Sequence, residues 1–196
     1  MTTRSSLRHE LRAARRALGR DVQKAAGRAV AARLSRERVY QRGRHIAFYL
    51  ANDGELDPCP LLLRAHDEGK TCYLPVLKPG RRNLMHFVPY QPGDPLRPNR
   101  FGIPEPVDPR GRQRAVTRLD LVLAPLVGFD DAGNRIGMGG GFYDRALAGL
   151  ARRRRWQRPK VIGLAHECQA VDQLPVRPWD VPLYAIATPE RIIRCG

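Results

Sequence analysis

The chain has no long apolar segment, few aromatic residues and far fewer acidic than basic ones. No stretch of 18 apolar residues occurs among its 196 residues, so we expect no transmembrane helix. The first residues, MTTRSSLRHELRAARRAL, contain no apolar core, which argues against a secretory signal, and Glu10 argues against a mitochondrial presequence. We therefore expect a cytoplasmic protein with no membrane partner.

Cysteine is also scarce, and its spacing does not suit a metal site. The four cysteines, Cys59, Cys72, Cys168 and Cys195, include no pair with CxxC spacing. Because no secretory signal is expected, reduced thiols are the expected state. We expect neither disulfides nor a zinc site.

Positive charge is abundant, with 35 Lys+Arg against 19 Asp+Glu and a formal net charge of +16. Such an excess is typical of nucleic-acid binding, but it also suits an enzyme whose substrates are anions such as ATP. The basic residues are spread along the chain, apart from one block at Arg152 to Arg155, and no RNA- or DNA-binding motif accompanies them. We favour the enzyme and expect no specific nucleic-acid partner.

Helices are predicted where apolar residues recur at helical spacing. A first helix is predicted from Leu7, Leu11, Ala14 and Leu18. It ends at Gly19, and Asp21 can cap a second helix that runs to Leu34. Farther along, Asp57-Pro58 is typical of an N-cap and a first helical residue, and Gly69 ends that helix. A last helix runs from Phe142 to about Arg154.

Strands are predicted where short apolar runs are rich in strand-forming residues. These runs are 45–51, 71–77, 83–90, 119–127 and 160–166, with one more strand in the tail AIATPERII. Residues 91–114 hold many prolines, glycines and arginines, and they predict a long connection or lid.

The alternation of strands and helices predicts one α/β domain over residues 1–196. We expect a three-layer, Rossmann-like sheet that is mostly parallel, with helices on both faces. Ligands of such sheets bind beyond the carboxyl ends of the strands. The loops after the strands at 45–51, 119–127 and 160–166 should therefore meet at one cleft.

The segment from Arg135 to Asp144 carries the strongest functional signal. Four glycines in the five positions 137–141 precede a predicted helix, and their exposed N–H groups suit a phosphate. Arg135 before them can clamp phosphate, and Asp144 after them can bind magnesium. The segment is not a Walker A motif, because Phe142-Tyr143 stands where Lys-Ser/Thr is needed. It is also unlike a dinucleotide fingerprint, because nine residues separate its glycines from the strand at 119–127. A purely structural glycine hairpin is the alternative.

Other charged residues have both a structural and a functional interpretation. Asp144 in a first helical turn also suits the helix dipole, and Asp57 suits a helix cap. Glu55 has no such structural role, so it is the better ligand candidate. Arg4 and Arg8 lie one helical turn apart and form either a solvated basic face or a contact to a triphosphate.

The sequence shows no arrangement for nucleophilic catalysis. The histidines, His9, His45, His66, His86 and His166, form no pair at metal-ligand spacing, and no Ser-His-Asp or Cys-His set is present. The expected chemistry is phosphoryl transfer by positioning and charge stabilisation.

Together these residues resemble the 5-formyltetrahydrofolate cyclo-ligase family, also called the 5,10-methenyltetrahydrofolate synthetases. The segments that carry the resemblance lie in the family's order along nearly the whole chain: Gly54 to Asp57, Phe101 to Pro106, Phe129 to Asp144, Gly163 to Gln169, Leu174-Pro175 and Trp179-Asp180. The signature from Phe129 to Asp144 is specific, and the others support it.

The resemblance implies an ATP-dependent ring closure. The γ-phosphoryl group of ATP passes to the formyl oxygen of 5-formyltetrahydrofolate, N10 attacks the activated carbon, and phosphate leaves to give 5,10-methenyltetrahydrofolate and ADP. The implied ligands are Mg2+, ATP and a reduced folate, including polyglutamylated forms. We expect the protein to be a monomer.

The resemblance also assigns residues to these ligands. ATP would contact Arg4, Arg8, Arg135, Ile136, Gly137, Met138, Gly139, Gly140, Gly141, Phe142 and Tyr143. The folate would contact Asn52, Glu55, Asp57, Met138, Gly139, Gly140, Gly141 and Phe142. Asp144 and Asp180 would hold magnesium. No side chain would act as a nucleophile, and Arg135 and the glycine loop, residues 137–141, would supply positioning and charge stabilisation.

The chain departs from the family pattern at three positions. Arg4 and Gly140 stand where members often have lysine, and Tyr184 stands where many have a second aspartate after the equivalent of Asp180. Two alternatives stay open. An isomerase of sugar phosphates, or a CoA-handling protein on a similar fold, would need no metal at Asp144. A basic RNA-binding module would bind nucleic acid in a salt-sensitive way and tolerate Asp144→Ala.

Overall fold

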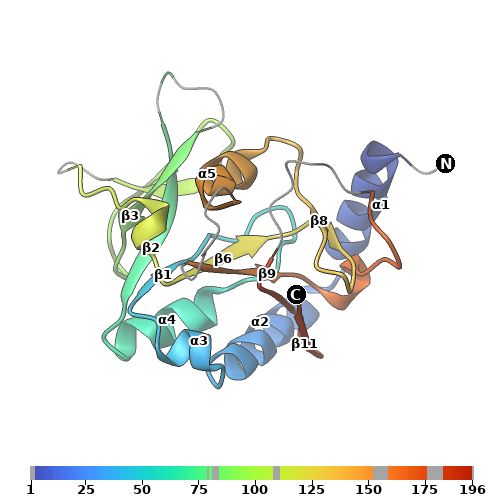
Figure 1. The fold of residues 1–196 in the computed structure, drawn as a ribbon, viewed down its shortest axis with the longest axis horizontal. Coiled ribbons are helices and arrows are strands. Elements are labelled where there is room, and N and C mark those ends of the chain that lie inside the picture. The colour runs from blue at the N-terminus through green and yellow to red at the C-terminus, as the bar shows by residue number, and fades with distance from the viewer. Residues whose placement is uncertain are drawn as a thin grey trace.

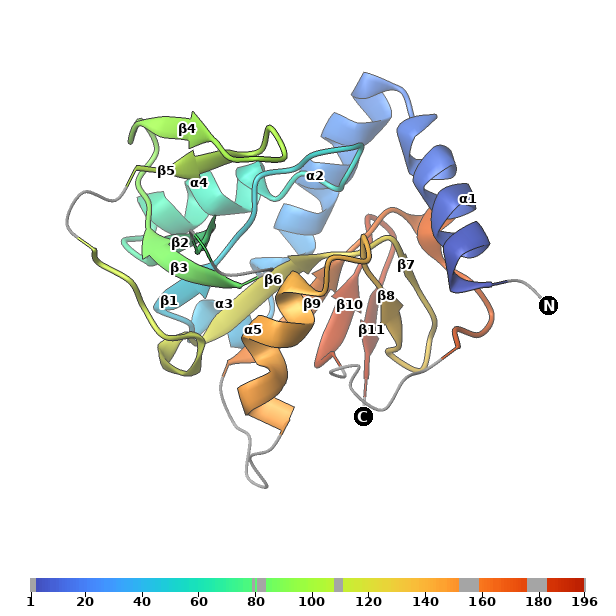
Figure 2. The same cartoon turned by 90° about the horizontal axis from the view of Figure 1, so that it is seen from above.

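A seven-stranded sheet runs through the part of the protein that the computed structural model describes, namely residues 3–78, 80, 84–107, 111–151, 159–175 and 183–195. The strand order is β11-β10-β9-β6-β1-β2-β3. In chain order these are β1 His45–Ala47, β2 Thr71–Leu77, β3 Met85–Pro89, β6 Leu121–Pro125, β9 Lys160–Leu164, β10 Ala185–Ala187 and β11 Ile192–Arg194. Figure 2 shows them side by side.

The sheet is mostly parallel, as the sequence predicted. Strands β10, β9, β6, β1 and β2 pair in parallel, and the edge strands β3 and β11 are antiparallel to their neighbours. In β1, the side chain of Ile46 packs into one core and that of Ala47 into the other, which is the alternation expected of a strand covered on both faces.

Helices cover both faces of the sheet, so the expected three layers are present (Figure 1). One layer holds α2 Arg20–Leu34, α3 Arg38–Gln41 and α4 Cys59–Asp67, whose apolar residues share a core with one face of the strands. The other holds α5 Phe142–Ala151, whose Leu147 is fully buried in the second core. Within the described ranges, no helix is both long and apolar enough to cross a membrane.

Helix α1 Arg4–Arg16 packs beside a small hairpin rather than on the sheet. The hairpin pairs β7 Gly128–Phe129 with β8 Arg135–Ile136, and Leu11 of α1 joins Val127 and Ile136 in a third apolar cluster. The Thr3 side chain accepts the Ser6 N–H and caps α1. The hairpin therefore fixes both α1 and the start of the glycine loop.

Two short elements and one hairpin complete the described chain. The 3-10 turns are η1 Val116–Arg118 and η2 Glu167–Gln169. The hairpin pairs β4 Leu96–Pro98 with β5 Pro104–Pro106, and it lies within the segment predicted as a connection or lid.

Several predicted boundaries were wrong. Gly19, not Asp21, is the N-cap of α2, and Asp21 lies in the first turn. Helix α4 begins one residue later than predicted, although the Asp57 carboxylate does accept the Cys59 N–H at 2.9 Å. The tail forms two strands, β10 and β11, and the described part of the last predicted helix ends at Ala151.

Candidate active site

The strand order of the sheet reverses direction between β1 and β6. These strands are neighbours, but the chain leaves β1 toward β2 and leaves β6 toward β9, in opposite directions. Such a switch in strand order opens a crevice beyond the carboxyl ends of the two strands. The turn after β1 and the residues after β6 both line a cavity there, as predicted.

The cavity has a volume of about 680 Å³, which is in the range of small-molecule sites. Its walls come from the turn after β1, from β2 and β3, from the tip of the β4–β5 hairpin, from the end of β6, and from the glycine loop with the start of α5. The loop after β9 was expected here, but it does not line the cavity. Instead, the Gln169 amide donates to the Leu126 and Val127 carbonyls at 2.6 and 3.0 Å and so supports the part of the cavity wall that these two residues form.

The glycine loop needs glycine for two different reasons. Gly139 and Gly141 have φ of +96° and +64°, a region that favours glycine. Gly140 has no such backbone, but a Cβ there would lie 2.8 Å from two ring carbons of Phe142. The ring of Phe142 therefore occupies the space that a side chain at position 140 would need.

An ion pair joins the two ends of the glycine loop. Nη2 of Arg135 lies 2.6 Å from Oδ1 of Asp144, and the two side chains are 7% and 37% exposed. Both residues line the cavity. The arrangement holds a cation and a carboxylate together at the loop.

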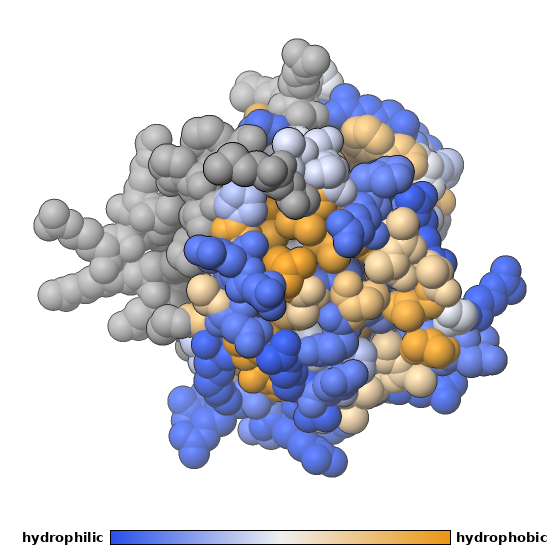
Figure 3. Space-filling view, turned by 90° about the vertical axis from the view of Figure 1, so that its right-hand side faces the viewer, coloured by the Kyte–Doolittle hydropathy of each residue, from blue (hydrophilic) through white to orange (hydrophobic). Residues whose placement is uncertain are grey.

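Arg4 and Arg8 brace the same loop through its carbonyl groups. Arg8 Nε donates to the Gly137 carbonyl at 2.7 Å. Arg4 donates to the Pro175 carbonyl at 2.7 Å and to the Arg135 carbonyl at 3.4 Å. Both line the cavity, so α1 supplies positive charge to the glycine-loop wall. The side of the molecule that carries α1 mixes hydrophilic residues with apolar areas at the centre and right of the view (Figure 3).

Glu55, in the turn after β1, also lines the cavity and is an unusual carboxylate. Its side chain is 11% exposed, and it accepts the Asn52 N–H at 3.1 Å. Burial raises the pKa of Glu55 to about 7, although the charge of Arg15 opposes this rise. A group with this pKa can accept or release a proton near neutral pH.

Two tyrosines lie close to Glu55. The Tyr49 hydroxyl donates to the Leu56 carbonyl at 2.5 Å, whereas the Tyr143 hydroxyl is buried and has no hydrogen-bond partner in the described part of the chain. Burial, with the nearby Glu55 charge, raises the pKa of Tyr143 well above its ordinary value. Tyr143 lines the cavity with other parts of its side chain, and its buried hydroxyl stays protonated and neutral.

The tip of the β4–β5 hairpin closes one side of the cavity. The Phe101 and Phe142 rings meet edge to face, with 5.8 Å between their centroids. The hairpin is attached to the sheet through Glu105, whose Oε1 accepts the Leu77 N–H at 3.0 Å and the Asn99 amide at 2.8 Å. The predicted lid is therefore an ordered hairpin that contacts the glycine loop.

The structure brings most of the predicted site residues to this one cavity. Those that line it are Arg4, Arg8, Asn52, Glu55, Arg135, Gly137, Met138, Gly139, Gly140, Gly141, Phe142, Tyr143 and Asp144. Ile136 is fully buried in the core instead, and the Asp57 side chain caps α4 without lining the cavity. Asp180 lies outside the described residues.

Sequence reasoning missed Arg15, which is fully buried behind the cavity. Its guanidinium donates to the Asp53 carbonyl at 2.9 Å and to the Leu126 carbonyl at 2.8 Å. The signal was present, because Arg15 follows Leu11 by four positions and therefore lies on the apolar face of the helix. An arginine on that face needs buried partners.

Comparison with known proteins identifies the family. The model of the 5-formyltetrahydrofolate cyclo-ligase family matches residues 1–189. The 5-formyltetrahydrofolate cyclo-ligase of Escherichia coli K12 is 40% identical over 184 residues, which cover 93% of this chain and 98% of that protein. The Haemophilus influenzae protein of the same name is 41% identical over 148 residues, covering 74% and 76%.

A solved structure agrees with these relatives. The Aquifex aeolicus 5,10-methenyltetrahydrofolate synthetase, determined by NMR, superposes with a TM-score of 0.80 and 27% identity, covering 97% of this chain and 91% of that one. The seven-stranded sheet, the glycine loop and the cavity at the switch in strand order are thus those of a protein related to these enzymes along almost its whole length. The chain belongs to the 5-formyltetrahydrofolate cyclo-ligase family, an enzyme family, as its motifs predicted.

Proposed function

We propose that the protein catalyses the ATP-dependent conversion of 5-formyltetrahydrofolate to 5,10-methenyltetrahydrofolate, with release of ADP and phosphate. One observation supports this most strongly. The cavity holds the glycine loop with its Arg135–Asp144 pair on one wall and the buried carboxylate of Glu55 on another. The glycine loop, as the proposed phosphate site, and a proton-accepting carboxylate would thus share one cavity.

ATP would bind at the glycine loop. The backbone N–H groups of residues 137–141 and the N-terminus of α5 favour phosphate oxygens. Arg135 would turn from Asp144 toward a phosphate, while Arg4 and Arg8 add positive charge from α1. The backbone of Ile136, whose side chain is buried, would take part only by positioning the loop.

Magnesium would be held by Asp144, with Asp180 as a second carboxylate. No three His, Cys, Asp or Glu side chains cluster as a metal site among the described residues. Magnesium is commonly bound by one or two carboxylates together with substrate phosphates, so an aspartate beside the glycine loop suits it. When bound, the ion would offset the negative charge on the transferred phosphoryl group.

The folate would lie between the glycine loop and the turn after β1. Glu55 and Asn52 offer polar contacts, and Phe142 offers an aromatic edge. Asp57 would act indirectly, because its carboxylate caps α4 and so fixes the end of this turn.

The chemistry would depend on positioning. The formyl oxygen attacks the γ-phosphorus of ATP and ADP leaves. N10 then attacks the activated formyl carbon, loses its proton to a base, and phosphate leaves as the ring closes. Holding the reacting groups in contact makes the closure effectively unimolecular. Arg135 and the loop N–H groups would stabilise charge on the phosphoryl group. Glu55 lines the cavity, and with a pKa of about 7 it is partly ionised near neutral pH, so its carboxylate form would accept the N10 proton.

The net charge of +16 suits a polyanionic substrate. We include polyglutamylated folates among the substrates, and the test is a comparison of mono- and polyglutamylated forms at rising salt. A larger loss of apparent affinity with salt for the longer form is expected. A monomeric state and a cytoplasmic location stay predictions.

The decisive assay follows ADP release and methenyl-folate absorbance together. We expect both only when 5-formyltetrahydrofolate, ATP and Mg2+ are all present. ADP release that does not depend on the folate would point to an ATPase instead, and the absence of any folate-dependent turnover would contradict the proposal.

A further inference from the structure

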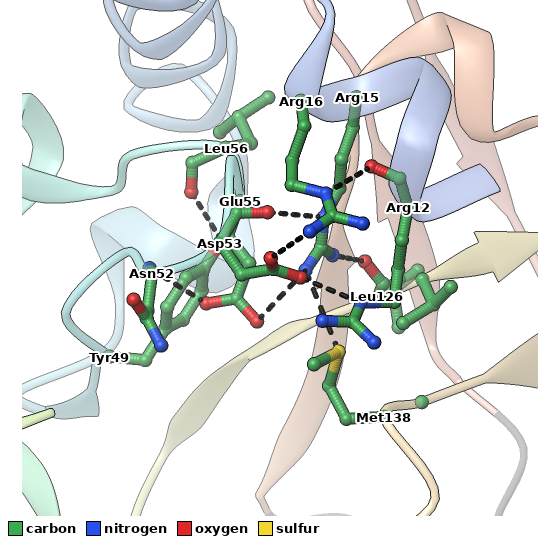
Figure 4. A network of polar contacts seen from close by, with 12 residues as sticks. Arg12, Arg15, Arg16, Tyr49, Asn52, Asp53, Glu55, Leu56, Leu126 and Met138 are labelled. Carbon is green, nitrogen blue, oxygen red and sulfur yellow. Dashed lines mark hydrogen bonds and ion pairs between the residues drawn. The ribbon is translucent and has the colours of Figure 1, made fainter. Parts of the chain in front are cut away.

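Arg15 is the most deeply buried charged residue of the described chain, and it lies directly behind the cavity. It is 0% exposed, although it sits on the basic helix α1. Its three nitrogens donate in different directions: Nε to the Asp53 carbonyl at 2.9 Å, Nη1 to the Leu126 carbonyl at 2.8 Å, and Nη2 to Asp53 Oδ2 at 3.0 Å. One guanidinium therefore ties α1 to the turn after β1 and to the end of β6 (Figure 4).

The same Nη2 also reaches two residues of the cavity wall. It lies 3.8 Å from Oε1 of Glu55 and 3.6 Å from Sδ of Met138. Glu55 belongs to the turn after β1, and Met138 belongs to the glycine loop. Arg15 is thus in contact with both walls that the proposed ligands would touch.

The turn that Arg15 holds has an uncommon backbone. Asp53 has a φ of +54° and is the one non-glycine residue with positive φ in the described chain. Its carboxylate also accepts from Arg12 at 2.8 Å. Burial alone would raise the pKa of Asp53, but the hydrogen bonds from Arg12 and Arg15 hold this pKa below its ordinary value. Such backbone persists where surrounding contacts fix it, often at functional sites.

We propose that Arg15 is a positioning residue, which fixes the Glu55 carboxylate and the Met138 side chain relative to each other and so sets the distance between the folate and nucleotide walls of the cavity. This inference rests on the proposed function for its kinetic consequences. Its electrostatic consequence for Glu55 can be measured without substrates.

The charge of Arg15 has a second consequence for Glu55. Burial raises the pKa of Glu55, and the Arg15 cation limits that rise. The titratable and charged groups that face Glu55 come from α1, from the turn itself, from the residues after β1 and from α5: Arg12, Arg15, Asp53, Tyr49 and Tyr143. Of the cations among them, Arg15 has the larger effect on Glu55.

Two substitutions separate geometry from charge. Arg15→Lys keeps the charge but cannot donate in a fixed planar fork, and Arg15→Gln keeps hydrogen-bonding groups but removes the charge. Arg16→Gln is the matched control, because Arg16 is the neighbour on α1, pairs with the same Asp53 at 3.4 Å, and is 47% exposed. Circular dichroism and thermal melts establish that each variant is folded.

The first readout is a carboxyl ¹³C NMR titration of Glu55, with Glu55→Gln used for assignment. We expect the midpoint to rise by about one pH unit in Arg15→Gln and to stay near the wild-type value in Arg15→Lys and Arg16→Gln. A midpoint in Arg15→Gln equal to that of Arg16→Gln would overturn the electrostatic part of the inference.

The second readout is steady-state kinetics. We expect kcat to fall about 100-fold in Arg15→Lys, because small misplacement of reacting groups is costly, with a much smaller change in Arg16→Gln. Arg15→Lys turnover equal to the control would overturn the positioning role, and this variant decides the point even if Arg15→Gln does not fold. If wild-type protein shows no folate-dependent turnover, the proposed function fails, whereas the NMR titration still tests Arg15.

Discussion

Arg135 and Asp144 form an ion pair across the two ends of the glycine loop, with 2.6 Å between Nη2 and Oδ1. In the proposed function these two residues have different ligands, since Arg135 would bind a phosphate and Asp144 a magnesium ion. Binding of ATP with its metal would therefore replace one internal ion pair with two contacts to the ligand. The pair keeps both charges at the loop until then, without leaving the nearly buried Arg135 unsatisfied.

Asp144→Asn should separate this role from a structural one. An asparagine can still accept the Arg135 hydrogen bond but is a poor magnesium ligand. We expect kcat to fall by about 100-fold or more. The melting temperature should change by less than about 4 °C, because a partly exposed ion pair contributes about 1 kcal/mol or less. Loss of folding would instead support the interpretation of Asp144 as a helix-dipole residue.

Glu55→Gln should change how stability depends on pH. Burial raises the pKa of Glu55 from 4.5 to about 7, so between these values the folded protein keeps a proton that the unfolded chain releases. The contribution of Glu55 to the free energy of unfolding of the wild-type protein therefore falls as the pH rises from 4.5 to about 7, and it is constant above that pH.

The neutral glutamine does not lose stability in this way as the pH rises. Its advantage in free energy of unfolding should grow across the same window to about 3 kcal/mol. Urea unfolding of both proteins at pH 5 and pH 8 measures it. An equal difference at the two pH values would show that Glu55 titrates normally.

We expect substitutions of Gly140 and Phe142 to have non-additive effects on the KM for ATP. A Cβ at Gly140 would lie 2.8 Å from the Phe142 ring, whereas one at Gly137 would meet nothing within 4 Å. We expect Gly140→Ala to raise the KM for ATP about tenfold, equivalent to about 1.4 kcal/mol, and Gly137→Ala to raise it less. In a Phe142→Leu background the added cost of Gly140→Ala should shrink. Additive effects would show that the ring is not the obstacle. The lysine that the family resemblance leads us to expect at position 140 would require the ring to move.

We expect Arg8 to contribute to ATP binding at the glycine loop more than to folate binding. It donates to the Gly137 carbonyl at 2.7 Å, and its guanidinium carbon lies 3.6 Å from where a Gly139 Cβ would be. We expect Arg8→Gln to raise the KM for ATP about tenfold and the KM for the folate less than about threefold. Equal increases for both substrates would indicate that Arg8 only holds the fold.

The sequence was a good guide where one pattern decided the structure. The run TCYLPVL became β2 with the predicted bounds, Thr71–Leu77, because strand-forming residues continue up to a proline- and glycine-rich turn. The glycine loop was found because its residues are adjacent in the chain. The Asp21 prediction failed because capping depends on the local backbone angles, which a residue type only favours.

Elements made by distant contacts were harder to predict. Hairpins β4–β5 and β7–β8 have strands of two or three residues, too short for a pattern of alternation. The role of Arg15 depends on Asp53 and Leu126, which lie 38 and 111 positions away. Its helical position indicates burial, but only the fold supplies its partners.

The most direct test of the account is the rise of methenyl-folate absorbance in a mixture of the purified protein, 5-formyltetrahydrofolate, ATP and Mg2+, with ADP measured in parallel. We predict one ADP released for each methenyl-folate formed, and neither product when the folate or ATP is left out. ADP without methenyl-folate, or no reaction of the complete mixture, would contradict the proposed function.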